Sequence, residues 1–403
     1  MRLSTNTIYS IGTQSILDQQ SRVSKLGEQL STGQRINNPS DDPRGAAQLL
    51  NLQQSSQINE QYASNRATAQ RQMSTEEDQL NQVTDALASA GQRLVQAANG
   101  TLGDADRESL ANQLEGVYDQ LVSNANAKDG NGRYIFAGFK SDTAPFSGST
   151  GALSFTGDNG QRQLQVDGSR QMAINDTGDK VFTSTTSNAS YVATAAADNS
   201  GSATYSALDI ADASADDYGR QFTLSFAVDG SGNTTYTVDG PNGTSDPQAY
   251  QPGEPIALGD SMQTKIKGAP ADGDSFTFAK DRGEDNNILN ALAQTVSTLR
   301  EPVNDDRSQA KLTNTINRAM RQVNNAQDNV LSVRSNLGTR LNELDNLDDV
   351  GQTMSTNYER NISSLRDADM VSTISDWSLA RVALQASQQT FTSIQQMSIF
   401  QQT

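Results

Sequence analysis

The chain of 403 residues contains no cysteine and no histidine. Their absence excludes imidazole bases, thiolate nucleophiles and the zinc sites that these two residue types build. It also excludes disulfides, so stability has to come from packing or from assembly with other chains. The lack of cysteine is compatible with a protein that is exported unfolded through a narrow channel.

The chain is also poor in apolar residues. Hydrophobic residues make up 34% of it, against about 45–50% with glycine included in ordinary globular proteins. Thin cores, and faces that become buried only in an assembly, fit this composition better than one large globule. No run approaches the roughly 18–20 apolar residues of a membrane-spanning helix. The opening MRLSTNTIYSIGTQSIL lacks the apolar segment of a cleavable secretory signal.

Basic residues are in deficit. The net charge is −17, and residues 141–283 hold 18 Asp/Glu against 8 Lys/Arg, which gives −10 for that segment. The acidic residues are scattered, so they indicate a solvated surface and not a site. Nucleic-acid binding requires a basic face that neutralises phosphates, which argues against that class of function.

Proline is absent between Pro43 and Pro145 and again after Pro302. Residues 141–283 hold 17 of the 30 glycines and 6 of the 9 prolines. Because these residues interrupt helices, the outer parts are predicted to be helical and the middle to consist of strands and loops.

Apolar residues recur every seven positions in both outer parts. The two series are Met73, Leu80, Leu87 and Leu94 with Val83, Ala90 and Ala97 beside them, and Ile316, Val323, Val330, Leu337 and Leu344 with Ala319, Ala326 and Val333. A sustained 3.5-residue period predicts long helices that pack along a narrow seam. Shorter helices are predicted around residues 110–121 and 288–299, the second ended by Pro302. One antiparallel bundle, with the middle segment inserted at its far end, accounts for all four.

The middle segment contains runs such as QFTLSFAVD and TTYTVDG, which alternate apolar and polar residues between turn residues and predict an antiparallel β domain. Residues 184–217 give no clear pattern.

The predicted fold class is α+β and multidomain, with a terminal-helix coiled coil, an antiparallel helical bundle and an inserted, mainly antiparallel β domain. The predicted domains are 1–33 as the N-terminal helix of an inner coiled coil, 34–45 as an extended connector, 46–140 with 284–358 as the discontinuous bundle, 141–283 as the outer β-rich domain, and 359–403 as the C-terminal connector and helix.

Both ends carry apolar stripes of their own. After Arg381 no charged residue follows through Thr403. Isolated helices are marginal in water, so the terminal helices are predicted to pair with each other, with neighbouring molecules, or with both. They are expected to be mobile in a monomer and ordered in an assembly. The predicted inner-domain and assembly interface consists of Tyr9, Ile16, Val23, Leu26, Leu30, Met370, Trp377, Leu384, Phe391, Ile394 and Phe400.

Residues 30–45, LSTGQRINNPSDDPRG, are typical of a connector that ends one helix and begins the next. Gly33 suits the left-handed position after a helix, and Pro39 pushes the residue before it into extended conformations. Asp42 and Pro43 are the expected cap and first residue of a new helix. The stretch therefore predicts a helix end, an extended crossing and a helix start. The candidate connector residues, with contacts within or between subunits, are Gly33, Arg35, Pro39, Asp41, Asp42 and Pro43.

No loop has the full pattern of a ligand site. Residues 30–45 lack the Gly-Lys-Ser/Thr of a phosphate loop and the alternating oxygen ligands of a calcium loop. KDGNGRY, residues 128–134, resembles the start of a calcium loop but lacks its later ligands, which favours a turn after a helix. Gly230–Gly232 is predicted to be a hairpin turn. No catalytic, cofactor-binding or metal-binding residue is predicted.

The two ends together resemble the bacterial flagellin superfamily. LSTGQRINNPSDDPRG is similar to its N-terminal signature, and residues 365–397, LRDADMVSTISDWSLARVALQASQQTFTSIQQM, are similar to its C-terminal signature. The resemblance covers about residues 1–140 and 284–403. Within the superfamily RYIFAGFKSDTAPF, residues 133–146, resembles the second of the two hook–filament junction families, whereas flagellins generally lack it. The alternative is a flagellin that forms the filament itself.

The resemblance implies a structural protein without enzymatic activity or cofactor. It implies export by the flagellar type III apparatus without a cleaved signal, and assembly outside the cell without membrane insertion. The implied partners are further copies of the chain, the first junction protein, flagellin, and an export chaperone at the C-terminal helix. Two other functions are weighed against it. A hydrolase could use paired carboxylates in residues 141–283, although nothing in the sequence pairs them, and the β domain could bind as an adhesin does.

Overall fold

The computed structural model describes residues 5–186, 189–206, 208–280 and 287–400. The chain divides into two compact units. Unit 1 comprises residues 1–66, 166–168 and 345–403, and unit 2 comprises residues 67–165 and 169–344. Two long helices, α2 (Pro43–Ala97) and α5 (Asp306–Arg366), contribute residues to both units.

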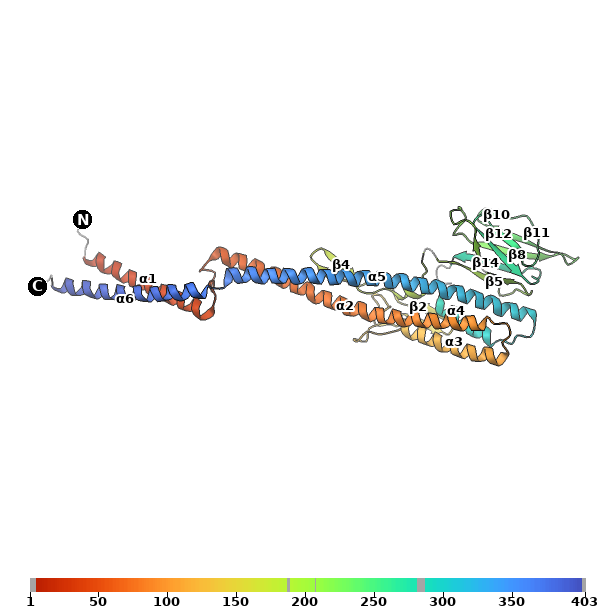
Figure 1. The fold of residues 1–403 in the computed structure, drawn as a ribbon, viewed down its shortest axis with the longest axis horizontal. Helices are drawn as coiled ribbons and strands as arrows, with labels where there is room; N and C mark the ends of the chain where they lie inside the picture. Colours follow the sequence, from red (N-terminus) through yellow and green to blue (C-terminus); the bar gives the residue numbers. More distant parts are fainter. Residues whose placement is uncertain (1–4, 187–188, 207, 281–286, 401–403) are drawn as a thin grey trace. The chain divides into compact units, whose positions relative to one another are not determined.

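Four further α-helices complete the helical part of the described chain (Figure 1). They are α1 (Thr5–Thr32), α3 (Asp104–Ala125), α4 (Ile288–Arg300) and α6 (Met370–Phe400). The helices predicted around residues 110–121 and 288–299 are α3 and α4, and α4 ends before Pro302 as expected. In unit 2, α3 and α4 pack together, and Arg300 of α4 forms an ion pair with Glu115 of α3 at 2.7 Å.

The seven-residue apolar series of α2 and α5 form the helical core of unit 2. All fifteen predicted seam residues are buried, with exposed fractions from 0% to 8%. Arg334 of α5 adds an ion pair to Glu77 of α2, with 2.8 Å between nitrogen and oxygen. The predicted seam is therefore confirmed, and it follows from burying one narrow stripe per helix.

The described residues between 146 and 280 form fourteen strands. They are β1 (Phe146–Ser149), β2 (Ala152–Phe155), β3 (Gln163–Asp167), β4 (Arg170–Ala173), β5 (Tyr191–Ala195), β6 (Thr204–Tyr205), β7 (Asp209–Ile210), β8 (Phe222–Val228), β9 (Thr234–Gly240), β10 (Gly243–Thr244), β11 (Gln248–Ala249), β12 (Pro255–Leu258), β13 (Met262–Lys267) and β14 (Ser275–Lys280). Every described pairing between them is antiparallel, as predicted.

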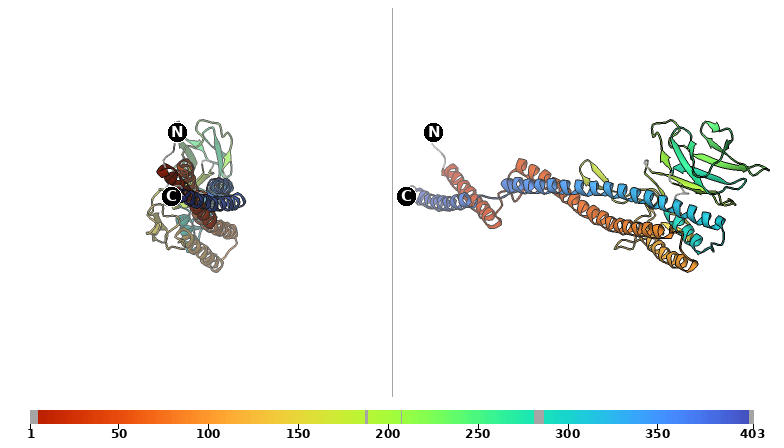
Figure 2. Two further views of the ribbon diagram at one scale, coloured as in Figure 1. Left: turned by 90° about the vertical axis from the view of Figure 1, so that its left-hand side faces the viewer. Right: turned by 45° about the vertical axis from the view of Figure 1, so that its right-hand side comes forward.

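Two of the sheets form a sandwich within unit 2 (Figure 2). The larger has the order β10-β9-β8-β14-β5 with β11 also on β9, and the smaller has the order β12-β13-β6 with β7 also on β13. Alternation along β8 directs Phe222, Leu224 and Phe226 inward. They meet Ile256 and Ile266 of the smaller sheet in one apolar core.

Residues 141–283 were predicted as a single β-rich domain, but the structure divides them into two groups. The sandwich takes the strands from Tyr191 to Lys280, and three of them, β5, β6 and β7, come from the stretch at 184–217 that gave no pattern. The hairpins β1–β2 and β3–β4 and the π-helix η1 (Asp179–Thr183) stand apart from it. Phe182 explains the division: its ring lies 5.7 Å from that of Phe136 and 5.4 Å from that of Phe146, so this segment packs on the chain that follows α3.

The two turns predicted from sequence are present. In the loop at 128–134, Asp129 accepts hydrogen bonds from the amides of Asn131 and Arg133 and pairs with the Arg133 guanidinium at 2.9 Å. Its carboxylate is therefore occupied by the loop itself. Gly232 has a φ of +82° between β8 and β9, the conformation that a tight hairpin turn requires of glycine.

Candidate functional site

The two terminal helices lie side by side in unit 1 (Figure 1). Most of the predicted interface residues whose side chains are described are half-buried in the seam between them. The half-buried members are Ile16, Val23, Leu26, Leu30, Trp377, Leu384 and Phe391. Tyr9 is 50% exposed, although its ring lies 5.0 Å from that of Phe391, and Met370 is 42% exposed. The side chains of Ile394 and Phe400 lie outside the described residues.

Small residues bring α1 and α6 close together. Ala380 of α6 is 5% exposed. A Cβ placed on Gly12 would come within 2.8 Å of the Phe391 ring, so only glycine leaves room for that ring. Above the seam, the Arg381 guanidinium lies 4.7 Å from the centre of the Trp377 ring, a cation–π contact that shields the indole.

A second apolar face runs along α6 beside the seam. At about 100° per residue, Val371 and Val382 lie roughly 120–160° around the helix from Trp377 and Leu384, whereas Ile374 lies only about 60–80° from them, at the edge between the two faces. Val371, Ile374 and Val382 are 81%, 49% and 63% exposed, and Leu379 is 66% exposed. We call these four residues the outer face of α6. The seven-residue stripe did not reveal it, because these residues lie between its positions, but their apolar character in a helix with few charges was a usable signal.

The connector joins α1 to α2 and returns against the turn between α5 and α6. Gly33 has a φ of +70° directly after α1, and its amide donates to the Gln29 carbonyl, which is the predicted helix end. Its carbonyl accepts from the amide of Ala368 at 2.9 Å. Arg35 donates through its side chain to the carbonyl of Leu365, with 2.8 Å from Nη2 to oxygen. Two chain segments more than 300 residues apart are thus tied together.

The aspartates of the connector organise its own backbone. Asp42 accepts a hydrogen bond from the amide of Gly45 at 3.0 Å, and α2 begins at Pro43, so the predicted cap is present. Asp41 accepts from the amide of Asn38 at 3.0 Å and pairs with Lys25 of α1 at 3.1 Å. These two contacts hold the pKa of Asp41 below its ordinary value. The side chain of Pro39, which follows Asn38, is exposed.

The motif at 133–146 is an anchor and not a ligand loop. Phe136 is fully buried, and its carbonyl accepts from the amide of Gly178 at 2.7 Å. Asp158 accepts from the amides of Phe139 and Lys140 at 2.9 and 2.8 Å. The motif therefore holds the segment of β1 to η1 against the helical part of unit 2.

Asparagines of α5 dock the sandwich on that helix, which sequence reasoning missed. Asn325 pairs with Ser190 in both directions, accepting from its amide and donating to its carbonyl, each at 2.9 Å. Asn314 does the same between the amide of Tyr205 and the carbonyl of Ala203 at 3.2 and 3.0 Å. Since an amide side chain on a helix usually faces water, its residue type alone gave no signal of this role.

A buried carboxyl pair lies beneath η1. Glu76 and Asp176 are both 0% exposed, and Glu76 accepts from the Asp176 amide at 2.9 Å. Burial, with a smaller contribution from the negative Asp176, raises the pKa of Glu76 to about 8. Asp176 pairs with Lys180 at 2.7 Å and with Arg340. Of these two buried acidic residues only Asp176 lies in residues 141–283, and its contact with Glu76 runs through its backbone amide. Their burial denies access to a substrate, and their contacts hold η1 on α2 and α5.

The described parts of the chain offer neither a metal site nor a membrane span. There, no group of three or more acidic side chains is arranged to hold a metal ion. The described helices also include none with the length and apolar content needed to cross a bilayer.

Comparison with known proteins first defines the class. The bacterial flagellin N-terminal helical region matches residues 3–141. The chain is 34% identical to flagellar hook-associated protein 3 of Escherichia coli strain K12 over 402 residues, which is 100% of this chain and 99% of the relative. The chain therefore belongs to the flagellar hook-associated protein 3 family, a family of structural flagellar proteins.

Solved structures agree with this assignment. A hook-associated protein 3 from Legionella pneumophila is 28% identical with a TM-score of 0.70, covering 78% of this chain and 98% of that one. The flagellar junction protein FlgL from the same species is 28% identical with a TM-score of 0.66, covering 79% and 100%. The prediction of a junction family, as opposed to a filament flagellin, is confirmed, and so is the α+β fold.

Proposed function

We propose that the chain is a structural, non-catalytic subunit that joins hook to filament by polymerising outside the cell. Its partners in the assembly are further copies of itself, the first junction protein on one side and flagellin on the other. Before assembly, an export chaperone covers the C-terminal helix, and export by the flagellar type III apparatus proceeds without a cleaved signal.

The outer face of α6 is the observation that carries this proposal. Burying one such side chain contributes about 1.5–3 kcal/mol, so Val371, Ile374, Leu379 and Val382 together leave a large stabilisation unused in a lone chain. A polymer subunit recovers it through neighbours that cover this face. Because a contact between unlike faces repeats from copy to copy, it generates a tubular layer.

The same reasoning assigns a role to the seam. The pair of α1 and α6 buries one face of each helix, and a two-helix pair with an open apolar face is only marginally stable. Neighbouring subunits complete its burial, so its folding and polymerisation are coupled and the assembly interface offsets the ordering cost. The predicted residues of the seam thus act first within the chain, and those of the outer face act between chains.

The test is a paired substitution on the outer face. Leu379→Gln with Val382→Gln removes apolar surface but leaves the seam intact, so fluorescence of the single tryptophan, Trp377, should stay unchanged. Cells carrying only this variant should export it yet shed their filaments and lose motility. Leu331→Gln, at a 53% exposed position of α5 in unit 2, is the control and should keep motility.

Normal filament retention by the paired variant would contradict the proposal. Deletion of residues 370–403 is a coarser test of the same idea. It should leave the helical core of unit 2 and the sandwich folded, because their described core residues come from unit 2 itself, while abolishing assembly.

A further inference from the structure

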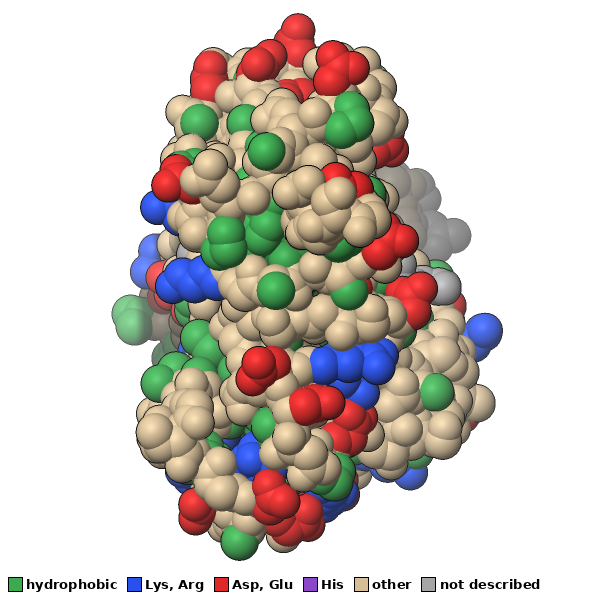
Figure 3. Space-filling model, turned by 90° about the vertical axis from the view of Figure 1, so that its right-hand side faces the viewer, with side chains coloured by type: hydrophobic (Ala, Val, Ile, Leu, Met, Phe, Trp, Pro, Cys, Tyr) green, Lys and Arg blue, Asp and Glu red, His purple; other side chains and the backbone are tan. Residues whose placement is uncertain are grey.

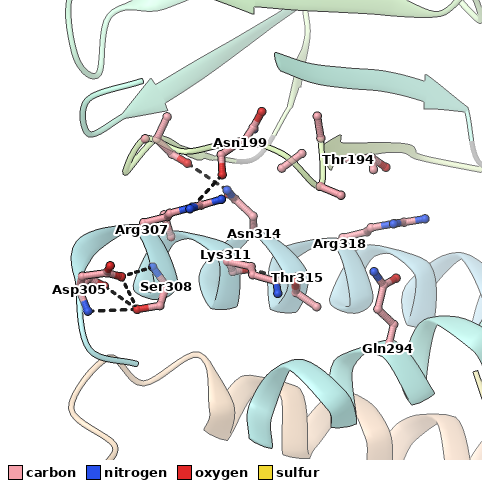
Figure 4. Close-up of a pocket in the computed structure, with 16 residues that line it drawn as sticks. Thr194, Asn199, Gln294, Asp305, Arg307, Ser308, Lys311, Asn314, Thr315 and Arg318 are labelled. Carbon is pink, nitrogen blue, oxygen red and sulfur yellow. Dashed lines mark hydrogen bonds between the residues drawn. The ribbon is translucent and has the colours of Figure 1, made fainter. Parts of the chain in front are cut away.

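A cleft with both polar and apolar walls lies inside unit 2 between the sandwich and α5 (Figure 4). Its volume is about 440 Å³. One wall is the chain from Thr194 to Ala203, at the end of β5 and beyond it, and the other is the first turns of α5, with Gln294 contributed by α4. The wall contributed by the sandwich consists largely of alanine and glycine, and the described residues that line the cleft include no aromatic ring. A compact polar ligand fits these walls better than a sugar or base that needs stacking.

Three cations of α5 face this cleft. Arg307, Lys311 and Arg318 are spaced by four and seven residues, which places them on one side of the helix. They contrast with the sandwich, because red acidic side chains outnumber blue basic ones in the upper part of the face that Figure 3 shows. The cleft is thus a cationic feature in a chain of net charge −17.

Two of these cations already have partners. Arg307 donates from Nε to the carbonyl of Asn199 at 3.1 Å, a contact visible in Figure 4. Lys311 forms an ion pair with Glu301 at 2.5 Å. The lining carboxylate of Asp305 is taken by the hydroxyl and amide of Ser308.

Arg318 differs from the other two. Its Nε is buried and has no hydrogen-bond partner, and among the described residues it forms no ion pair. It is this nitrogen that is buried, since the Arg318 side chain as a whole is partly exposed. A buried donor without an acceptor is costly. Arg318 and Gln294 also line a second, more open hollow of about 710 Å³, whose other lining residues come from α3, α4 and the hairpin β1–β2. The two side chains therefore stand where the two hollows meet.

We propose that this cleft binds a compact anion bearing carboxylate or phosphate groups, held by the Arg318 guanidinium and the Gln294 amide. The ligand supplies the acceptors that Arg318 lacks, and an arginine fork matches the two oxygens of a carboxylate or phosphate. The same chemistry can come from a free anion or from the acidic side chains of a second copy of this chain.

The experiment measures citrate and inorganic phosphate binding to the full chain by calorimetry at constant ionic strength. Wild type should bind at least one of them, and Arg318→Gln should weaken that binding about ten- to a hundredfold, the loss expected for one charged hydrogen bond. Arg71→Gln is the matched control, since Arg71 is exposed on α2, lines neither hollow and carries the same charge. It should bind as wild type does.

Two further measurements make the result decisive. Without ligand, Arg318→Gln should unfold at the same temperature as wild type or higher, because an unpaired buried donor has been removed. If a second copy supplies the carboxylates, sedimentation should show self-association of wild type and of Arg71→Gln that Arg318→Gln lacks. The proposal is overturned if neither anion binding nor self-association depends on Arg318.

Discussion

Gly12 of α1 packs directly against the ring of Phe391 of α6, and a side chain at position 12 has no room there. A Cβ on Gly12 would lie 2.8 Å from the ring, whereas a Cβ on Gly27 of the same helix would lie 3.6 Å from the Trp377 indole nitrogen, an ordinary contact. The two glycines therefore differ in role although both sit in α1. The first permits close approach of the helices, and the second only fills a position in the seam.

This difference yields the first prediction. Gly12→Ala should destabilise the helix pair by about 1–3 kcal/mol, the usual effect of overpacking. Gly27→Ala should be neutral or stabilise it by about 0.5–1 kcal/mol, because alanine favours helix over glycine. Denaturant unfolding followed by Trp377 fluorescence reports on this pair alone, as the chain has one tryptophan. Equal effects of the two substitutions on the free energy of unfolding would mean that the close Gly12–Phe391 contact does not restrict the side chain at position 12.

The second prediction concerns the connector. Gly33 has a φ of +70° with nothing near its missing Cβ, so any penalty at this position comes from the backbone and not from a clash. Gly33→Ala should cost roughly 1–2 kcal/mol, and Gly33→Asn should recover much of this, since asparagine tolerates the left-handed conformation. Filament retention should follow the same order. A variant series that is insensitive to this backbone preference would show that connector geometry does not govern assembly.

The repetitive features of this protein could be predicted from its sequence. Burial of one stripe on a long helix imposes a seven-residue period, and so Leu80 and Val323 could be assigned to the core in advance. The end of α1 before Gly33 and the start of α2 at Pro43 follow from local backbone preferences, which act within a few residues. What depended on contacts between distant segments could not be predicted. Asn325 looks like a surface residue until Ser190 is brought against it.

The outer face of α6 was missed for a related reason. A seven-residue period identifies only one stripe on a helix, and Trp377 and Leu384 already account for that period in α6. Val371 and Val382 are out of phase with that stripe, and their exposure shows that they form a face of their own. The domain boundaries at residues 141 and 358 stay predictions. In the structure α5 continues past 358, and the strands after 141 fall in two groups.

The third prediction tests the docking of the sandwich. Asn325→Ala leaves the amide and carbonyl of Ser190 without their partner, which should cost about 1–3 kcal/mol. Hydrogen exchange in residues 189–195 should accelerate accordingly. Asn324→Ala is the matched control, because Asn324 is the exposed neighbour on the same helix. It should leave exchange unchanged, and faster exchange in both variants would indicate a general loss of helix stability instead.

The fourth prediction follows from the buried carboxyl of Glu76. Its pKa is about 8 in the folded chain against 4.5 for an ordinary glutamate. Between these values the folded state binds more protons than the unfolded state, so this group's contribution to stability is fully present below pH 4.5 and is lost as the pH rises toward 8. The slope reaches up to about 1.4 kcal/mol per pH unit. Glu76→Gln cannot ionise, so it should remove this slope and be the more stable form near pH 8.

Glu77→Gln provides the contrast, since Glu77 is the next residue and forms a partly exposed ion pair with Arg334. It should lower stability slightly at all pH values above the acid range and keep the slope caused by Glu76. Denaturant unfolding of wild type and both variants at intervals from pH 5 to pH 8 separates the two effects. If wild type and Glu76→Gln change in parallel over this range, Glu76 is ionised in the folded protein, and Lys180 and Arg340 then stabilise its charge as well as that of Asp176.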